Sequence, residues 1–221
     1  FLSIARKYDT ELALACDENE LGEREQLAFL GIYARPELYE LAGNCTIQTS
    51  QGSICIGAAP YGLALPSTLV DFIMEIDLTA IRSITFIENK TNYDAYVMSE
   101  KQPEELVVYH GGFLSPQKKR LIASIAHAAS ETMKIRFWAD IDTGGFRMFR
   151  HLQELIPSLT LMRMSSKFVD FFHEHGLARS EAYLSSLRID VENGKYPLFR
   201  DAIERILNYG VTIEQETFLN E

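Results

Sequence analysis

The sequence is poor in cysteine, and the cysteines it has lack the paired spacing of disulfide frameworks and zinc sites. Its 221 residues include three, Cys16, Cys45 and Cys55, and no two of them form a Cys-x-x-Cys pair. An odd, scattered set of thiols argues against a disulfide framework and fits a reducing cytoplasm. We therefore expect a cytoplasmic protein with free thiols. Neither a zinc signature nor a helix-turn-helix pattern is present.

Long hydrophobic runs and an excess of positive charge are also missing. The longest apolar run, 63–73, is interrupted by Pro66 and Asp71, whereas a membrane span needs roughly 18 apolar residues. The sequence has 21 Lys and Arg against 31 Asp and Glu, a net charge of −10. Because basic side chains dominate non-specific DNA binding, this chain is not expected to hold DNA by overall charge. A DNA-cutting function would need basic partners or a basic region outside this sequence.

An initiator methionine is absent as well, since the chain opens at Phe1 without a signal-like pattern. We therefore expect a fragment whose N-terminal part is missing. Its composition, 47% hydrophobic and 24% charged, is that of an ordinary globular protein. In residues 1–80 the pattern predicts a small α+β segment. Its expected elements are a helix over 19–30, a hairpin of strands 45–49 and 54–57 turning near Gly52, and a helix over 66–76.

From residue 83 onward, strand-like and helix-like runs alternate four times. The expected strands are 84–87, 106–109, 135–138 and 159–164. Such alternation predicts a parallel sheet with right-handed crossovers, and continuous apolar runs are typical of strands covered on both faces. We therefore expect an α/β core of four parallel strands with flanking helices over 81–166. Residues 167–221, whose apolar spacing is helical, should form a helical extension packed on it.

Acidic residues stand at the ends of two of these strands. Glu88 ends the first, and Asp140 and Asp142 end the third. Ligands of open α/β sheets bind beyond the carboxyl ends of the strands, so the three carboxylates should lie together. Grouped carboxylates repel one another, and a hard cation such as Mg²⁺ would neutralise them. The pattern predicts a Mg²⁺-dependent enzyme that acts on phosphate.

Other residues near these strand ends are weaker candidates. Lys90 could contact a phosphate, and Gly111 and Gly112, which end the second strand, are also candidate substrate contacts. Glu214 and Glu216 lie on a strand-like run in the tail and could approach the site; His110 is a weaker candidate still. Each feature alone has an ordinary explanation: a solvated loop glutamate, an aspartate that caps a helix, a tight glycine turn or a surface lysine. Only their joint order at strand ends favours a metal site.

The same residues resemble a known family. A Glu after the first strand, then a glycine turn, then Asp-x-Asp after a later strand is similar to the TOPRIM domain of topoisomerases, primases and related nucleases. The more particular strings are IENK (87–90), GGF (111–113), WADIDTGGF (138–146) and IEQE (213–216). Together they resemble the C-terminal region of the JetD family, the topoisomerase VI-like nucleases of the bacterial Wadjet plasmid-defence system. The resemblance runs from about Glu23 to the end and is strongest over 84–164; Ala139 stands where the family more often has Gly.

This resemblance implies a Rossmann-like TOPRIM core and a metal-dependent endonuclease that cleaves plasmid DNA. It implies that Glu88, Asp140 and Asp142 hold Mg²⁺, or Mn²⁺, and are catalytic. It also implies recruitment by an SMC-like ATPase complex, a homodimer and no membrane partner. Because the family's N-terminal DNA-binding portion is not in this sequence, the fragment alone is expected to bind metal better than it cuts.

Two alternatives remain open. A topoisomerase-like transesterification would need a nucleophilic tyrosine on the missing domain, and none of the ten tyrosines here has a recognisable setting for it. A non-catalytic scaffold that docks to the ATPase complex would use the same fold without its chemistry. Intact carboxylates at all three positions argue against the scaffold.

Overall fold

The computed structural model of the chain describes residues 1–19, 35–112 and 114–220, together with 22, 23, 26, 27, 30 and 32. The chain divides into two compact units, Phe1–Glu37 and Leu38–Glu221. In the first, α1 (Leu2–Tyr8) and α2 (Thr10–Asn19) are adjacent helices, and Arg6 Nε donates to Gln26 Oε1 at 2.9 Å. The helix expected over 19–30 lies largely outside the described residues.

The second unit is built on a mixed six-stranded sheet in the order β4-β1-β7-β6-β8-β9. The strands are β4 (Leu63–Pro66), β1 (Leu38–Ala42), β7 (Glu105–Tyr109), β6 (Ser83–Ile87), β8 (Lys134–Trp138) and β9 (Thr160–Leu161). The four strands expected from the sequence pair in parallel, β6 with β7 and β8, and β8 with β9. Antiparallel β1 and β4 extend the sheet at the β7 edge, so the α/β class is confirmed but the sheet is larger than four parallel strands.

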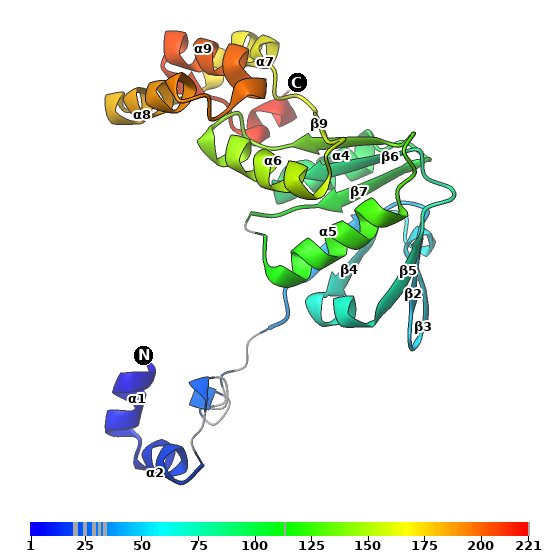
Figure 1. Cartoon of the computed structure of the whole chain (residues 1–221), viewed down its shortest axis with the longest axis vertical. Helices are drawn as coiled ribbons and strands as arrows, with labels where there is room; N and C mark the ends of the chain where they lie inside the picture. The colour runs from blue at the N-terminus through cyan, green and yellow to red at the C-terminus, as the bar shows by residue number, and fades with distance from the viewer. Residues whose placement is uncertain are drawn as a thin grey trace. The chain divides into compact units, whose positions relative to one another are not determined.

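The helices that cover this sheet follow the strands directly: α4 (Lys90–Ser99), α5 (Pro116–Ala128) and α6 (Thr143–Leu155). The step from β6 to β7 runs one way across the sheet, and the steps from β7 to β8 and from β8 to β9 run the other way. Right-handed crossovers therefore place α4 on one face and α5 and α6 on the other, as Figure 1 shows. Side-chain caps start the helices, since Asn89, Ser115 and Asp142 each accept a backbone N–H three residues on.

A second, three-stranded sheet is formed by the chain between β1 and β6 and is ordered β3-β2-β5. The predicted hairpin is confirmed as β2 (Thr46–Thr49) and β3 (Gly52–Cys55), with Gly52 at φ 141°. The helix predicted over 66–76 is wrong: a 3-10 segment, η2 (Ser67–Phe72), is followed by strand β5 (Ile73–Asp77). Pro66 suits the start of a helix, but pairing of β5 with β2 determines the conformation of the residues that follow.

The chain ends in the expected helical extension, which contains α7 (Ser166–Phe172), α8 (Glu181–Glu192) and α9 (Arg200–Tyr209). Short strands β10 (Leu177–Ala178) and β11 (Val211–Thr212) pair with each other. The segment after β11 returns to the core: Ile213 forms a bridge with Ile141, and the Phe218 ring packs against Trp138. Among the described helices, none has the length and apolar character to cross a membrane.

Candidate functional site

The three acidic residues singled out in the sequence lie together beyond the ends of β6 and β8. The backbone N–H of Glu88 donates to the Trp138 carbonyl at 3.0 Å, which ties the two strand ends together. Ile141, between the two aspartates, is fully buried, and its N–H donates to the Ile213 carbonyl. Glu88, Asp140 and Asp142 are close enough for mutual charge repulsion. We call these three residues, with Glu216, the acidic cluster.

Each of the three carboxylates accepts a backbone N–H from a different segment. Asp140 Oδ1 accepts from Gln215 at 2.7 Å, and Asp142 Oδ1 accepts from Gly145 in the first turn of α6 at 2.9 Å. Glu88 Oε1 accepts from Gly112 at 3.3 Å. Three separate segments of the chain therefore fix the positions of the carboxylates.

Burial, with the clustered charges, raises the pKa of two members. Burial raises the pKa of Asp140 to about 6; the Gln215 N–H opposes this rise, and repulsion from Asp142, Glu88 and Glu216 adds to it. Burial also raises the pKa of Glu88, where the Gly112 N–H opposes and the Asp142 and Glu216 charges add. The ionised cluster is therefore costly for the protein without a cation.

The glycine pair after β7 shapes one side of the site. Gly111 and Gly112 both have φ near 50°, a left-handed conformation that favours glycine. A Cβ atom on Gly111 would lie 2.7 Å from the Tyr109 ring, whereas one on Gly112 would meet nothing within 4 Å. Lys118 Nζ donates to the Gly111 carbonyl at 2.5 Å, and its charge lowers the pKa of Glu88 slightly against the dominant effect of burial.

The remaining sequence candidates divide into those near the cluster and those engaged elsewhere. Glu216 belongs to the cluster, and its Oε1 accepts from Asn89 Nδ2 at 2.6 Å. Lys90 instead forms ion pairs with Glu40 at 2.7 Å and Asp94 at 2.6 Å. His110 is buried, and its ring packs edge-on against Phe137. For Glu214, no contact with the cluster is seen in the described part of the chain.

Gln215 is a site residue that the sequence did not reveal. It is fully buried and forms four hydrogen bonds, since besides its bond to Asp140 it contacts the ends of β6 and β8 and helix α4. Its Oε1 accepts from the N–H of Asn89, its Nε2 donates to the Trp138 carbonyl, and its own carbonyl accepts from Asn92 Nδ2. A glutamine between two glutamates near the chain end has the composition of a solvated tail, so apart from its place in the IEQE string no local signal marks it.

The helical extension supplies two further residues that the sequence pattern missed. Arg179 Nη2 lies 3.4 Å from Asp142 Oδ2, and its Nε donates to Thr212 Oγ1 at 2.7 Å. The Tyr183 hydroxyl accepts from the N–H of Thr143 at the start of α6, and the Arg179 guanidinium lies over the Tyr183 ring. These contacts place a cation beside Asp142.

The oxygen ligands of the acidic cluster suit a hard cation such as Mg²⁺ in their chemistry. Their arrangement is less complete. Among the described residues, no three Asp, Glu, His or Cys side chains converge closely enough to hold a metal ion. Asp142 has one oxygen on the Gly145 N–H and the other near Arg179. The residues therefore fit Mg²⁺ by donor type, and binding would require the carboxylates to turn toward one another.

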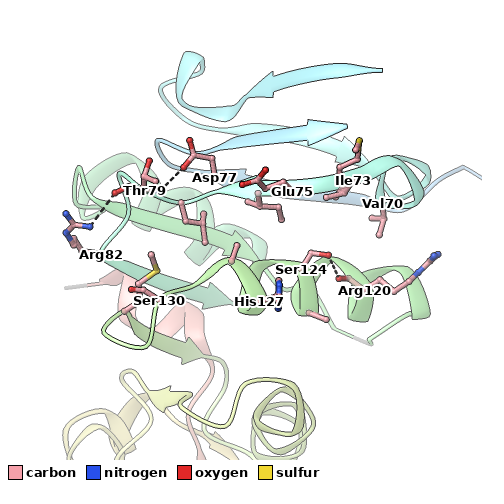
Figure 2. Close-up of a pocket in the computed structure, with 16 residues that line it drawn as sticks. Val70, Ile73, Glu75, Asp77, Thr79, Arg82, Arg120, Ser124, His127 and Ser130 are labelled. Atoms are coloured by element: carbon pink, nitrogen blue, oxygen red, sulfur yellow. Dashed lines mark hydrogen bonds between the residues drawn. The ribbon is translucent and has the colours of Figure 1, made fainter. Parts of the chain in front are cut away.

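Of the cavities formed by described residues of the second unit, two are large, and the smaller of these adjoins the cluster. The larger, about 1010 Å³, has β5 on one wall and α5 on the other, and none of the predicted site residues lines it (Figure 2). The smaller, about 560 Å³, begins at Glu88 and Gly112 and continues along α6. Proximity to the carboxylates makes the smaller cavity the relevant one, although it holds about half the volume.

Comparison with known protein families places the chain beside a described family. A family model described as Wadjet protein JetD, C-terminal, matches residues 56–220, about three quarters of the chain and including the whole acidic cluster. The search of curated proteins found no match.

Proposed function

Because the chain belongs to the family of JetD C-terminal regions of Wadjet proteins, we propose that its acidic cluster is the Mg²⁺ centre of a nuclease that cuts DNA. One observation carries the proposal. Glu88, Asp140 and Asp142 lie at the ends of two neighbouring parallel strands. Burial, together with their mutual repulsion, raises the pKa of Glu88 and of Asp140. Perturbed carboxylates grouped at such strand ends are typical of functional sites.

We assign the parallel part of the sheet, with its helices, to a TOPRIM-type core. The supporting features are the parallel order β7-β6-β8-β9 and the positions of the acids directly after β6 and β8. The antiparallel strands β1 and β4 are then an addition at the β7 edge. On this assignment the core spans 81–166, with an α+β segment before it and a helical extension after it.

The proposed reaction is hydrolysis of a phosphodiester. Bound Mg²⁺ would polarise a phosphate oxygen and stabilise charge on the leaving oxygen. Asp140 and Asp142 would hold the ion, with Asp140 oriented by the Gln215 N–H. Glu88 would act as a further ligand or, with its raised pKa, accept a proton from the attacking water on the oxygen that Gly112 leaves unbonded.

The substrate and partners follow from the family and from the charge. We propose plasmid DNA as the substrate, an SMC-like ATPase complex that delivers it, and a second copy of the chain as a dimer partner. A net charge of −10 supports delivery by others, because this chain has little overall attraction for DNA.

A scaffold without catalysis is the second candidate. The observation that favours it is the lack, among described residues, of three ligands already converged on one point. A scaffold would keep the fold and dock to the same complex, but its carboxylates would bind no metal ion.

Calorimetric titration of Mg²⁺ and Mn²⁺ into this chain separates the two. We expect binding by the wild type and none by the triple variant Glu88→Gln, Asp140→Asn, Asp142→Asn. The matched control removes three acids outside the cluster, Glu75→Gln, Asp77→Asn and Glu131→Gln, and should bind as the wild type does. A folded wild type that binds neither ion would refute the metal centre and favour the scaffold.

A further inference from the structure

The smaller cavity forms a cleft that leads away from the acidic cluster. Glu88 lies at its start, and the residues of α6 that line it share one face of that helix. They are Gly144, Arg147, Met148, His151, Glu154 and Leu155. These residues are spaced three to four apart, so the cleft extends along most of α6. From Gly144 to Leu155 this is about 16 Å at 1.5 Å per residue. Helix α5, which neighbours α6 in Figure 1, contributes Lys119.

The cations of this cleft are free to bind a ligand. Lys119 and Arg147 are exposed, and neither has an ion-pair partner among the described residues. Most arginines elsewhere in the second unit are paired, including Arg120 with Asp71 and Arg136 with Glu105. In a chain with net charge −10, two unpaired cations on opposite walls of one cleft imply an anionic ligand.

The remaining lining indicates the kind of anion. Met148 and Leu155 give the cleft apolar surface between its charged walls. A single small phosphate would leave that surface bare, whereas a nucleic acid strand presents sugar and base faces between successive phosphates. Glu154 lies near the far end, about 11 Å along α6 from Arg147, and limits the positive stretch.

We propose that this cleft binds the backbone of one DNA strand, with Lys119 and Arg147 contacting the phosphates next to the one held at the acidic cluster. The inference rests on the proposed function, because it takes the strand in the cleft to be the strand that is cut. Continuity is its physical reason: a phosphodiester that reaches Glu88 belongs to a polymer, and its neighbouring phosphates need a concave, cationic path. The cleft begins at Glu88 and supplies that path.

Equilibrium DNA binding without metal tests the cleft separately from the chemistry. Fluorescence anisotropy in EDTA would compare the wild type with the double variant Lys119→Gln, Arg147→Gln, for single-stranded and duplex oligonucleotides over a range of salt. The control is the double variant Lys134→Gln, Arg150→Gln. Both of these cations lie outside the cleft, and neither forms an ion pair with a described residue. Arg150 is on the same helix as Arg147, so the control also tests for a general effect of charge on α6.

We expect the cleft variant to lower the slope of log K against log salt by about 1.4 to 1.8, since each phosphate contact contributes about 0.7 to 0.9. The control should keep the wild-type slope. An equal loss in both variants would mean that only net charge matters and would overturn the inference, as would a wild type that binds neither form of DNA. Inorganic phosphate that competes as well as an oligonucleotide would show a site for small anions instead of a strand.

The two proposals fail in different measurements. Loss of Mg²⁺ binding in the triple carboxylate variant tests the metal centre by calorimetry, and that result does not depend on Lys119 or Arg147. If the wild type binds metal and the cleft variant keeps the wild-type salt slope, the proposed metal centre stands and only the strand-binding cleft is refuted.

Discussion

Replacing Asp140 with asparagine should stabilise the metal-free protein at neutral pH. Burial and neighbouring charges raise the pKa of Asp140 from 3.8 to about 6, so its charged form is disfavoured in the folded state. Asparagine carries no charge but keeps an oxygen that can accept the Gln215 N–H. The substitution therefore removes the repulsion and retains the hydrogen bond.

The size of the effect follows from the two pKa values. Their difference corresponds to about 3 kcal/mol in the free energy of unfolding. Asp140 is only partly buried and solvent screens its repulsions, so we expect about 1 to 2 kcal/mol. For a chain of this size that is a rise in Tm of about 3 to 6 °C.

The pH dependence gives the prediction its sign. The pKa of Asp140 is higher in the folded state than in the unfolded state. The free energy of unfolding of the wild type therefore falls as pH rises from about 4 through about 6, because Asp140 must then carry its charge in the folded protein. The Asp140→Asn advantage should therefore be absent near pH 4 and complete above pH 7. Thermal unfolding of both proteins in EDTA at several pH values would measure it, with exposed Glu131→Gln as a control that should change little.

Adding Mg²⁺ should reverse the order. A ligand that binds only the folded state stabilises it by about 2.7 kcal/mol at a hundredfold excess over Kd, and the wild type should gain more of this than Asp140→Asn. An Asp140→Asn protein that is no more stable than the wild type at pH 7.5 in EDTA would refute the electrostatic reasoning. Equal stabilisation of both proteins by Mg²⁺ would refute the role of Asp140 as a ligand.

Two further residues give predictions, one for the stability of the fold and one for Mg²⁺ affinity. Gln215→Ala should lower the free energy of unfolding by about 2 to 4 kcal/mol, because it removes the buried bond to the Trp138 carbonyl and leaves the partly buried Asn89 N–H without its acceptor. Gln51→Ala in the exposed hairpin turn should cost little in the same denaturant titration. Arg179→Gln should raise Mg²⁺ affinity several-fold in calorimetry, since it removes the cation 3.4 Å from Asp142; unchanged or weaker binding would show that Arg179 does not compete with the ion.

The central strands of the six-stranded sheet could be predicted from the sequence because both of their faces are covered by helices. β6, β7 and β8 begin within one residue of the expected positions, because strands covered on both faces by helices are rich in apolar residues. β1 and β4 were not expected. They are four to five residues long and partly exposed, and β1 joins the sheet through residues more than sixty positions away. Their length is close to that of the central strands, so their partial exposure and distant partners are what leave little local signal.

The acids of the site could be predicted for a similar reason, since a strand end is a position that the sequence marks. What holds those acids could not. Gln215 bonds to Asp140 across 75 residues and to Asn89 across 126, and Arg179 reaches Asp142 across 37. Glutamine and arginine are common on surfaces, so their types distinguish neither residue from a solvated one.

The dependence of the site on the helical extension follows from these contacts. The N–H groups that orient Glu88 and Asp142 come from within the core, from Gly112 and Gly145, but the N–H that orients Asp140 comes from Gln215. Asp140 is also the residue whose pKa is raised furthest within the cluster, to about 6, and the Gln215 bond is the one interaction that opposes this rise. The extension therefore acts on Asp140 in both directions, since the Gln215 N–H lowers its pKa and the Glu216 charge raises it. The order of acids along the sequence therefore defines the candidate ligands, and the end of the chain orients Asp140 among them.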